Sequence, residues 1–261
     1  MNLFNLEGRT IIVVGGAGYL ALPACRQMAA FGARVIIADR ARERLEEAAA
    51  QVRETAPEAE IDTHYVDLAD EASIDAMIDY TLRRHGRLDG LVNAGAAAAG
   101  KSFDALTGED FTRANDVNLN GFFLSARKAA EGMPETGGAI VLISSMYGIV
   151  APDPRVYHAP MRPNPIEYGV AKAGILQMTR YLAAHYGPRN IRVNAVAPGP
   201  FPKPGQYPDA PDFLERLAGR TMLGRIGQRD EIAGAITYLI SDAARYVTGH
   251  CLTVDGGWTA W

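Results

Sequence analysis

Short apolar runs alternate with longer amphipathic stretches along this chain, and this alternation constrains its fold more than any other feature. The apolar runs are rich in Val and Ile on both faces, which is typical of parallel strands covered by helices on either side. The expected strands are 10–14, 34–38, 61–66, 88–92, 139–143, 191–196 and 251–254. The expected helices are 20–31, 41–54, 71–85, 109–131, 165–186 and 230–240. The order predicts a doubly wound α/β fold.

Composition narrows the class of protein. The 261 residues are 48% hydrophobic and 21% charged, as in globular proteins, and the net charge of −4 disfavours nucleic-acid binding. Neither Cys25 and Cys251 nor the five histidines show metal-ligand spacing, so no metal is expected. A signal peptide and a bilayer-spanning apolar run are also missing from the sequence. We therefore expect a cytoplasmic protein with no membrane partner.

A glycine-rich turn follows the first expected strand. Gly16-Ala-Gly18-Tyr-Leu-Ala21 fits the G-x-G-x-x-G/A pattern and opens a helix. Glycines let a pyrophosphate approach the backbone, and the helix N-terminus attracts its negative charge. An ordinary strand-to-helix turn can have the same glycines, so the pattern alone is weak evidence for a dinucleotide-binding site.

The end of the second expected strand adds a carboxylate. Asp39 follows the glycine turn by about 20 residues, the spacing of the acid that binds the adenosine ribose. Its charge would repel a 2′-phosphate, which favours NAD over NADP. Arg40 beside it could accommodate that phosphate, so NADP stays the less favoured alternative.

A tyrosine and a lysine stand four residues apart on one helix. Asn164 is expected to cap this helix, with Pro165 at its first position and Glu167 completing a capping box. Tyr168 and Lys172 then share a face near the helix start. A cation and a helix N-terminus both lower a tyrosine pKa, so Tyr168 is predicted to serve as a general base. A surface pair on an amphipathic helix would look the same.

Three further polar residues support the chemical interpretation. Ser144 and Ser145 end an expected strand, at the sheet edge where ligands bind. Asn118 lies within the expected helix 109–131, a poor place for Asn unless its amide has a partner.

With these motifs, the chain resembles the short-chain dehydrogenase/reductase family over nearly its whole length. Further matching segments are Val66-Asp67-Leu68, Leu91-Val-Asn93-Ala94-Gly95, Asn194-Ala-Val-Ala-Pro198-Gly199, Thr248-Gly249 and Val254-Asp255-Gly256-Gly257. The resemblance implies one Rossmann-type domain over 1–261 with a seven-stranded parallel sheet. It also implies an active-site loop 146–163, a substrate-side segment 198–220 and a homo-oligomer, usually a tetramer.

The resemblance also implies residue roles. Tyr168 would be the acid/base, Lys172 would hold the nicotinamide ribose and lower the tyrosine pKa, Ser145 would position the reacting oxygen, and Asn118 would support a water relay. The implied cofactor contacts are Gly15, Gly18, Tyr19, Leu20, Asp39, Arg40, Asp67, Leu68, Asn93, Ala94, Gly95, Tyr168, Lys172, Pro198, Gly199 and Phe201.

This sequence departs from the family pattern at several places. Val14 replaces a usual Thr, Tyr19 and Ala21 replace glycines, and Pro200-Phe-Pro-Lys203 stands where a Thr is frequent. The long gap from Ser145 to Tyr168 resembles a subgroup with sugar and sugar-acid chemistry. The loop is proline-restricted and carries basic residues suited to an anionic group. The candidate substrate contacts are Ser145, Arg155, His158, Arg162, Tyr168 and Lys203.

The sequence therefore predicts an NAD-dependent oxidoreductase acting on a secondary alcohol or ketone of a sugar, sugar acid or related polyol. A 3-oxoacyl or other ketone reductase is the alternative within enzymes. A non-catalytic nucleotide sensor or scaffold is the alternative of another class, since fold alone does not exclude it.

Overall fold

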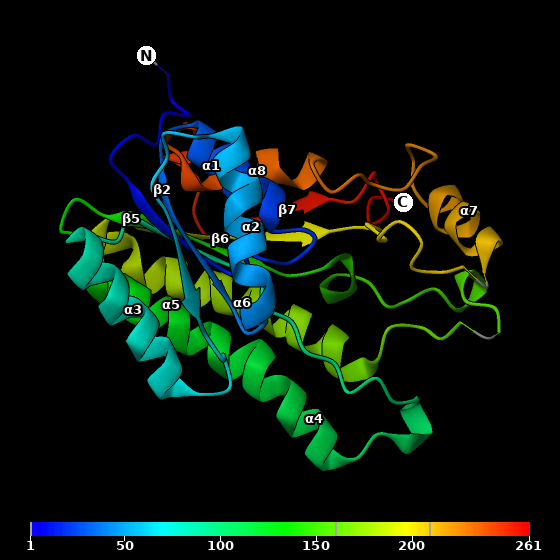
Figure 1. The fold of residues 1–261 in the computed structure, drawn as a ribbon. Coiled ribbons are helices and arrows are strands. Elements are labelled where there is room, and N and C mark those ends of the chain that lie inside the picture. Colours follow the sequence, from blue (N-terminus) through cyan, green and yellow to red (C-terminus); the bar gives the residue numbers. More distant parts are fainter. Residues whose placement is uncertain (1, 160, 209) are drawn as a thin grey trace.

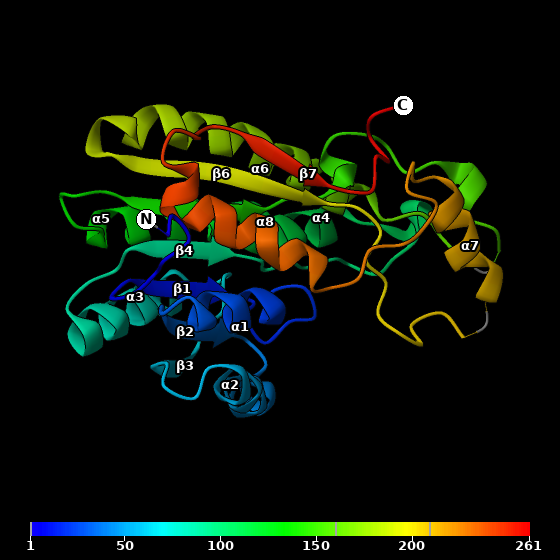
Figure 2. The same cartoon turned by 90° about the horizontal axis from the view of Figure 1, so that it is seen from above.

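A single parallel sheet organises the molecule. The computed structural model describes residues 2–159, 161–208 and 210–261; Met1, Pro160 and Asp209 lie outside them, within the predicted domain, loop and substrate-side segment. The sheet order is β3-β2-β1-β4-β5-β6-β7, with every neighbouring pair parallel (Figure 2). The strands are β1 Thr10–Val14, β2 Arg34–Asp39, β3 Ile61–Tyr65, β4 Gly90–Asn93, β5 Gly138–Ile143, β6 Ile191–Pro198 and β7 Cys251–Val254. The predicted seven-stranded parallel sheet is confirmed.

Helices cover both faces of this sheet (Figure 1). They are α1 Leu22–Ala30, α2 Arg42–Thr55, α3 Glu71–His85, α4 Gly108–Asn115, α5 Gly121–Gly132, α6 Ile166–Tyr186, α7 Pro211–Gly219 and α8 Glu231–Ile240. Helices α1, α2 and α8 pack on one face, and α3, α5 and α6 pack on the other. The strands are therefore apolar on both sides: Ile11 and Val13 enter one core cluster, while Ile12 and Val14 enter the other.

The expected helix 109–131 is wrong as one continuous element. A π-helical turn, Asp116–Asn120, separates α4 from α5. It turns Asn118 into the interior, where the side-chain amide accepts from Ala97 N at 2.9 Å and donates to Ala97 O at 2.7 Å. Such turns often occur at functional sites. The tertiary contact with the loop after β4 explains the break.

The expected cap of α6 is also wrong. The helix begins at Ile166, Pro165 occupies the cap position, and no side chain caps it. Neither Asn164 nor Glu167 forms the predicted capping box. The Glu167 carboxylate is fully buried and accepts from Ala99 N at 3.0 Å instead, which ties the start of α6 to the loop after β4.

Two segments extend beyond the carboxyl edge of the sheet: the loop 146–163 and α7, which the sequence reading did not expect as a helix. They lie beside each other in both views (Figures 1 and 2). Arg216 Nε of α7 donates to Val156 O of the loop at 2.7 Å. In the described ranges, no helix is long and apolar enough to cross a membrane.

Candidate active site

Two adjoining cavities follow the carboxyl edge of the sheet. The first, about 600 Å³, lies over β1, β2 and β4, and the second, about 470 Å³, continues toward β5 and β6. Both are lined by Gly15, Gly18, Ala94, Ala96 and Lys203. Together they form one elongated site, as expected where the strand order reverses in an open α/β sheet.

The glycine turn fits a closely approaching group. Gly15 has a φ of +71°, and a Cβ there would lie 2.9 Å from Ala94 O. A Cβ at Gly18 would lie 2.8 Å from Gly15 O. Side chains at these two positions would therefore clash with the backbone, and their absence leaves the N-terminal end of α1 open to a pyrophosphate.

Asp39 stands at the outer end of the first cavity. The residue is 8% exposed, and its Oδ1 accepts from Ala41 N at 3.0 Å. Arg40 and Arg44 line the same cavity, with Arg44 Nη2 3.9 Å from the Asp39 carboxylate. The sequence did not predict Arg44 as a residue of this site. The acid and the two arginines thus meet where an adenosine ribose would lie.

The other predicted cofactor residues fall mostly on these cavities. Asp67, Leu68 and Gly95 line the first. Tyr19, Leu20, Pro198, Gly199 and Phe201 line the second. Asn93 lines neither: it is fully buried, donates to Ser125 Oγ at 2.8 Å and accepts from Gly95 N at 3.1 Å. Its position shapes the loop rather than the surface of the cavity.

Ser145, Tyr168 and Lys172 come together at the inner end of the second cavity. Lys172 is 2% exposed and its Nζ donates to Ile143 O at 2.8 Å, 5.5 Å from the centre of the Tyr168 ring. Ser144, whose role the sequence did not show, donates to Lys172 O at 2.7 Å. This bond fastens the end of β5 to the helix that carries the pair.

Burial controls the protonation of this pair. It raises the pKa of Tyr168, against the opposing effect of the Ser145 hydroxyl. It lowers the pKa of Lys172 to about 7. The predicted lowering of the Tyr168 pKa is therefore wrong for the protein alone, because desolvation disfavours the phenolate and leaves the Lys172 amine only partly protonated at neutral pH.

The predicted water-relay and substrate residues are not all at this end. Asn118 lines neither cavity along the sheet edge, although its neighbour Val117 lines the first. Arg155 donates to both carboxylate oxygens of Asp153 and is not among the residues that line the cavities described here. The same is true of His158, which is exposed. Lys203 alone of the basic candidates lines the second cavity.

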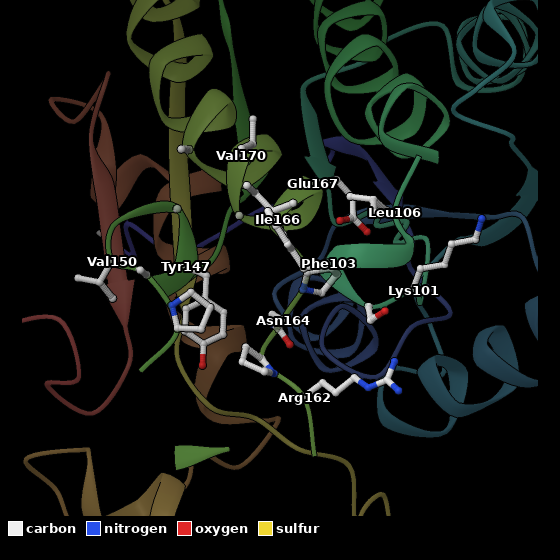
Figure 3. A pocket seen from close by; sticks show the side chains of 18 of the residues that line it. Lys101, Phe103, Leu106, Tyr147, Val150, Arg162, Asn164, Ile166, Glu167 and Val170 are labelled. Atoms are coloured by element: carbon white, nitrogen blue, oxygen red, sulfur yellow. The ribbon is translucent and has the colours of Figure 1, made fainter. Parts of the chain in front are cut away.

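Arg162 lies instead on a third cavity, of about 640 Å³, beside the start of α6 (Figure 3). Tyr147 and Val150 lie on one side of it, and Lys101 and Arg162 lie on the other. Glu167 also lines it, and within the described ranges the Glu167 Oε2 atom has no hydrogen-bond partner. This cavity is mainly apolar and does not include Ser145 or Tyr168.

We expect Lys172→Met to make the ligand-free protein more stable at pH 7 by about 1–3 kcal/mol, because a buried cationic group is removed. The folded pKa of Lys172 is about 7, against 10.5 for an unperturbed lysine. The unfolded chain thus binds more protons between these values, and the wild-type protein gains stability as pH rises through that window. The advantage of the variant should shrink by pH 9.5.

Urea unfolding at both pH values checks this, with exposed Lys203→Met as the matched control. A Lys172→Met variant less stable than the wild type at pH 7 would contradict the assignment of a costly buried amine.

Comparisons with known proteins show the family of this chain. A family model described as enoyl-(acyl carrier protein) reductase matches residues 19–259. Cyclopentanol dehydrogenase from Comamonas sp. (strain NCIMB 9872) is 33% identical, over 98% of this chain and 99% of that protein. Galactitol 2-dehydrogenase (L-tagatose-forming) from Cereibacter sphaeroides is also 33% identical, over 99% of this chain and 98% of that protein.

A solved structure of a related protein shares the fold and contains a bound cofactor. The gluconate 5-dehydrogenase from Burkholderia cenocepacia J2315, in complex with NADP and tartrate, has a TM-score of 0.88 at 31% identity. The match covers 100% of this chain and 98% of that one. The chain therefore belongs to the short-chain dehydrogenase/reductase family, whose members are oxidoreductases that act on small molecules with a nicotinamide cofactor.

Proposed function

We propose that this protein is an NAD-dependent oxidoreductase that interconverts a secondary alcohol and its ketone. One observation carries the proposal: two adjoining cavities that share lining residues have Ser145, Tyr168 and Lys172 at one end and the Asp39 carboxylate at the other. A dinucleotide fits this arrangement, with its pyrophosphate at the Gly15 and Gly18 turn and its adenosine ribose at Asp39. We propose that the whole of 1–261 serves as one such domain in a cytoplasmic homo-oligomer.

When bound, the cofactor supplies or accepts the hydride at its nicotinamide ring. The side chains of the protein donate and accept the proton. The raised pKa of Tyr168 keeps its phenol protonated at neutral pH, ready to donate to a carbonyl oxygen as hydride reaches the carbonyl carbon. In the reverse direction the phenolate takes the alcohol proton as the hydride leaves. Ser145 would orient that oxygen, and Lys172 would hold the nicotinamide ribose of the bound cofactor.

This assignment gives a pH trend. Because burial raises the Tyr168 pKa, the phenolate needed for alcohol oxidation forms only at alkaline pH. Alcohol oxidation should therefore accelerate as pH rises above neutrality, whereas ketone reduction is favoured near neutral pH.

A sugar, sugar acid or related polyol is the substrate class that the long loop suggests. Lys203 and Gln206 support it, since both line the cavity that holds Ser145 and Tyr168. The relatives named for galactitol and gluconate point the same way. The pairing of Arg155 with Asp153 removes one predicted contact to an anionic group.

Two alternatives remain distinguishable. An NADPH-dependent ketone reductase is favoured by Arg40 and Arg44 beside Asp39. A non-catalytic sensor would need no proton-transfer groups around its cavity, so the assembled Ser145, Tyr168 and Lys172 argue against it.

The test is a substrate screen with purified protein, following ultraviolet absorbance of the reduced cofactor. Cyclic alcohols, polyols and sugar acids are offered with NAD or NADP, and the corresponding ketones with NADH or NADPH. Turnover with NAD on a secondary alcohol supports the proposal. Cofactor binding without turnover of any alcohol or ketone would indicate the sensor.

A further inference from the structure

Glu167 is a buried acid that stands directly before the proposed proton donor, Tyr168. The residue is fully buried, and its Oε1 atom accepts from Ala99 N at 3.0 Å. The Oε2 atom has no hydrogen-bond partner among the residues that the structure describes. The proposed proton transfer uses neither oxygen, so the presence of an acid at this place needs another explanation.

A buried carboxylate of this kind destabilises the folded chain. Taking its charge out of water is unfavourable, and the Oε2 atom of Glu167 adds to this because it has lost its hydrogen bonds to water. A neutral side chain of the same length would avoid the charge. Folds keep such unfavourable groups mainly where a functional site needs them. The place of Glu167 beside Tyr168 therefore points to a role in the site.

The loop that Glu167 contacts is a wall of the cofactor site. Ala96 lines both cavities along the sheet edge. The next residue, Ala97, is held by two hydrogen bonds to the side-chain amide of the buried Asn118. Ala99 lies two residues further on. The loop is thus fastened to the interior and gives Glu167 a fixed point of attachment.

Helix α6 needs such an attachment near its first turn, because no side chain caps the start of the helix. On the far side of Tyr168, Ser144 Oγ donates to Lys172 O at 2.7 Å. On the near side, Glu167 holds the helix through Ala99 N, and Figure 3 shows its side chain reaching from α6 toward the segment that carries Lys101. The helix is therefore fastened on both sides of the general acid.

The bond of Glu167 joins two walls of one cavity. Tyr168 and Ala96 both line the cavity that holds Ser145. Through Ala99, the bond fixes the helix that carries Tyr168 against the loop that carries Ala96. The phenol is thereby held relative to a cofactor lying along that loop. Catalysis is sensitive to such placement, since a shift of about 1 Å can lower a rate by about 10²-fold.

We propose that Glu167 is a positioning residue for the reaction. By accepting from Ala99 N, its carboxylate sets the Tyr168 hydroxyl against the bound cofactor and the substrate oxygen. Glu167 lines neither cavity along the sheet edge, so it acts through Tyr168 and not on the substrate itself. The inference rests on the proposed function. The position needs an acceptor, so a neutral acceptor of the same shape keeps most of the effect.

The experiment compares Glu167→Met, which removes the acceptor but keeps the length of the side chain, with Glu167→Gln, which keeps the acceptor. On an active substrate Glu167→Met should lower kcat about 10–100-fold, with KM and NADH binding nearly unchanged. Glu167→Gln should keep kcat within about threefold of the wild type. The exposed matched control, Glu135→Met, should keep the wild-type kcat. Urea unfolding verifies that every variant is folded.

A double-mutant cycle with Tyr168→Phe separates positioning from a general structural role. If Glu167 acts through the Tyr168 hydroxyl, Glu167→Met should change kcat less than about twofold once that hydroxyl is gone. A structural role would lower kcat by the same factor in both backgrounds. Hydrogen exchange of the Ala99 N–H reports on the bond without turnover: it should become faster in Glu167→Met and stay slow in Glu167→Gln.

Four results would overturn the inference: a nearly wild-type kcat for Glu167→Met, equal losses in both backgrounds, equal losses for the Met and Gln variants, or exchange of the Ala99 N–H that Glu167→Met leaves unchanged. Each of them leaves the proposed dehydrogenase intact, because the wild type still turns over its substrate. Absence of turnover with every alcohol and ketone would instead overturn the proposed function, and this inference with it.

Discussion

Replacing Tyr168 by Phe is expected to lower kcat by about 10²–10⁴-fold, the usual cost of removing a general acid/base. The ring remains, so its packing against the aromatic cluster near Tyr147 and Phe213 is retained. Binding of NAD should change little, because the proposed ribose contact belongs to Lys172. The measurements are steady-state kinetics on an active substrate from the screen and NADH binding by fluorescence.

Tyr181 provides the matched control for this experiment. It lies on the same helix, α6, and is 70% exposed, so Tyr181→Phe removes an exposed hydroxyl that does not line the cavity of Ser145 and Tyr168. The control should keep the wild-type kcat. Near-full activity of Tyr168→Phe would assign proton transfer to another group.

The sheet and its covering helices could be predicted from the sequence because parallel strands buried on both faces carry a strong pattern. Five of the seven strands consist almost entirely of buried residues, such as the fully buried β1, Thr10–Val14. The exact bounds of α3, Glu71–His85, also follow from local signals: Asp70 caps its start and Gly86 ends it in a left-handed conformation. Local physical chemistry decides these elements.

The failures have tertiary causes. The break at Asp116–Asn120 depends on the contact of Asn118 with Ala97, which is distant in sequence. The start of α6 depends on the bond of Glu167 to Ala99, which competes with a capping box. Neither contact has a short-range signal in the sequence.

In the candidate site, too, some positions could be predicted from the sequence and others could not. Positions with a fixed place after a strand or on a helix face, such as Gly15, Asp39, Tyr168 and Lys172, line the cavities as expected. Contacts of the long loop could not be predicted. Arg155, for example, donates to its neighbour Asp153 instead of lining a cavity. Protonation states also depend on burial, which reversed the expected shift of the Tyr168 pKa.

The second large effect concerns the cofactor. We expect the wild type to use NAD about 10²-fold more efficiently than NADP, because the Asp39 carboxylate would face a 2′-phosphate in a confined cavity. Asp39→Ala should reduce this ratio of kcat/KM values to within about tenfold of unity. With the acid removed, Arg40 and Arg44 are left on the same cavity wall to attract the phosphate.

Asp39→Asn separates the charge of this residue from its contribution to the turn. The amide oxygen of Asn can still accept from Ala41 N, the bond that Asp39 Oδ1 makes at 3.0 Å. If charge repulsion sets the preference, Asn and Ala should shift the cofactor ratio equally. If only Ala shifts it, the turn geometry is responsible instead. Kinetics with both cofactors on one substrate measure the ratio, and equal efficiencies in the wild type would contradict the assignment of NAD.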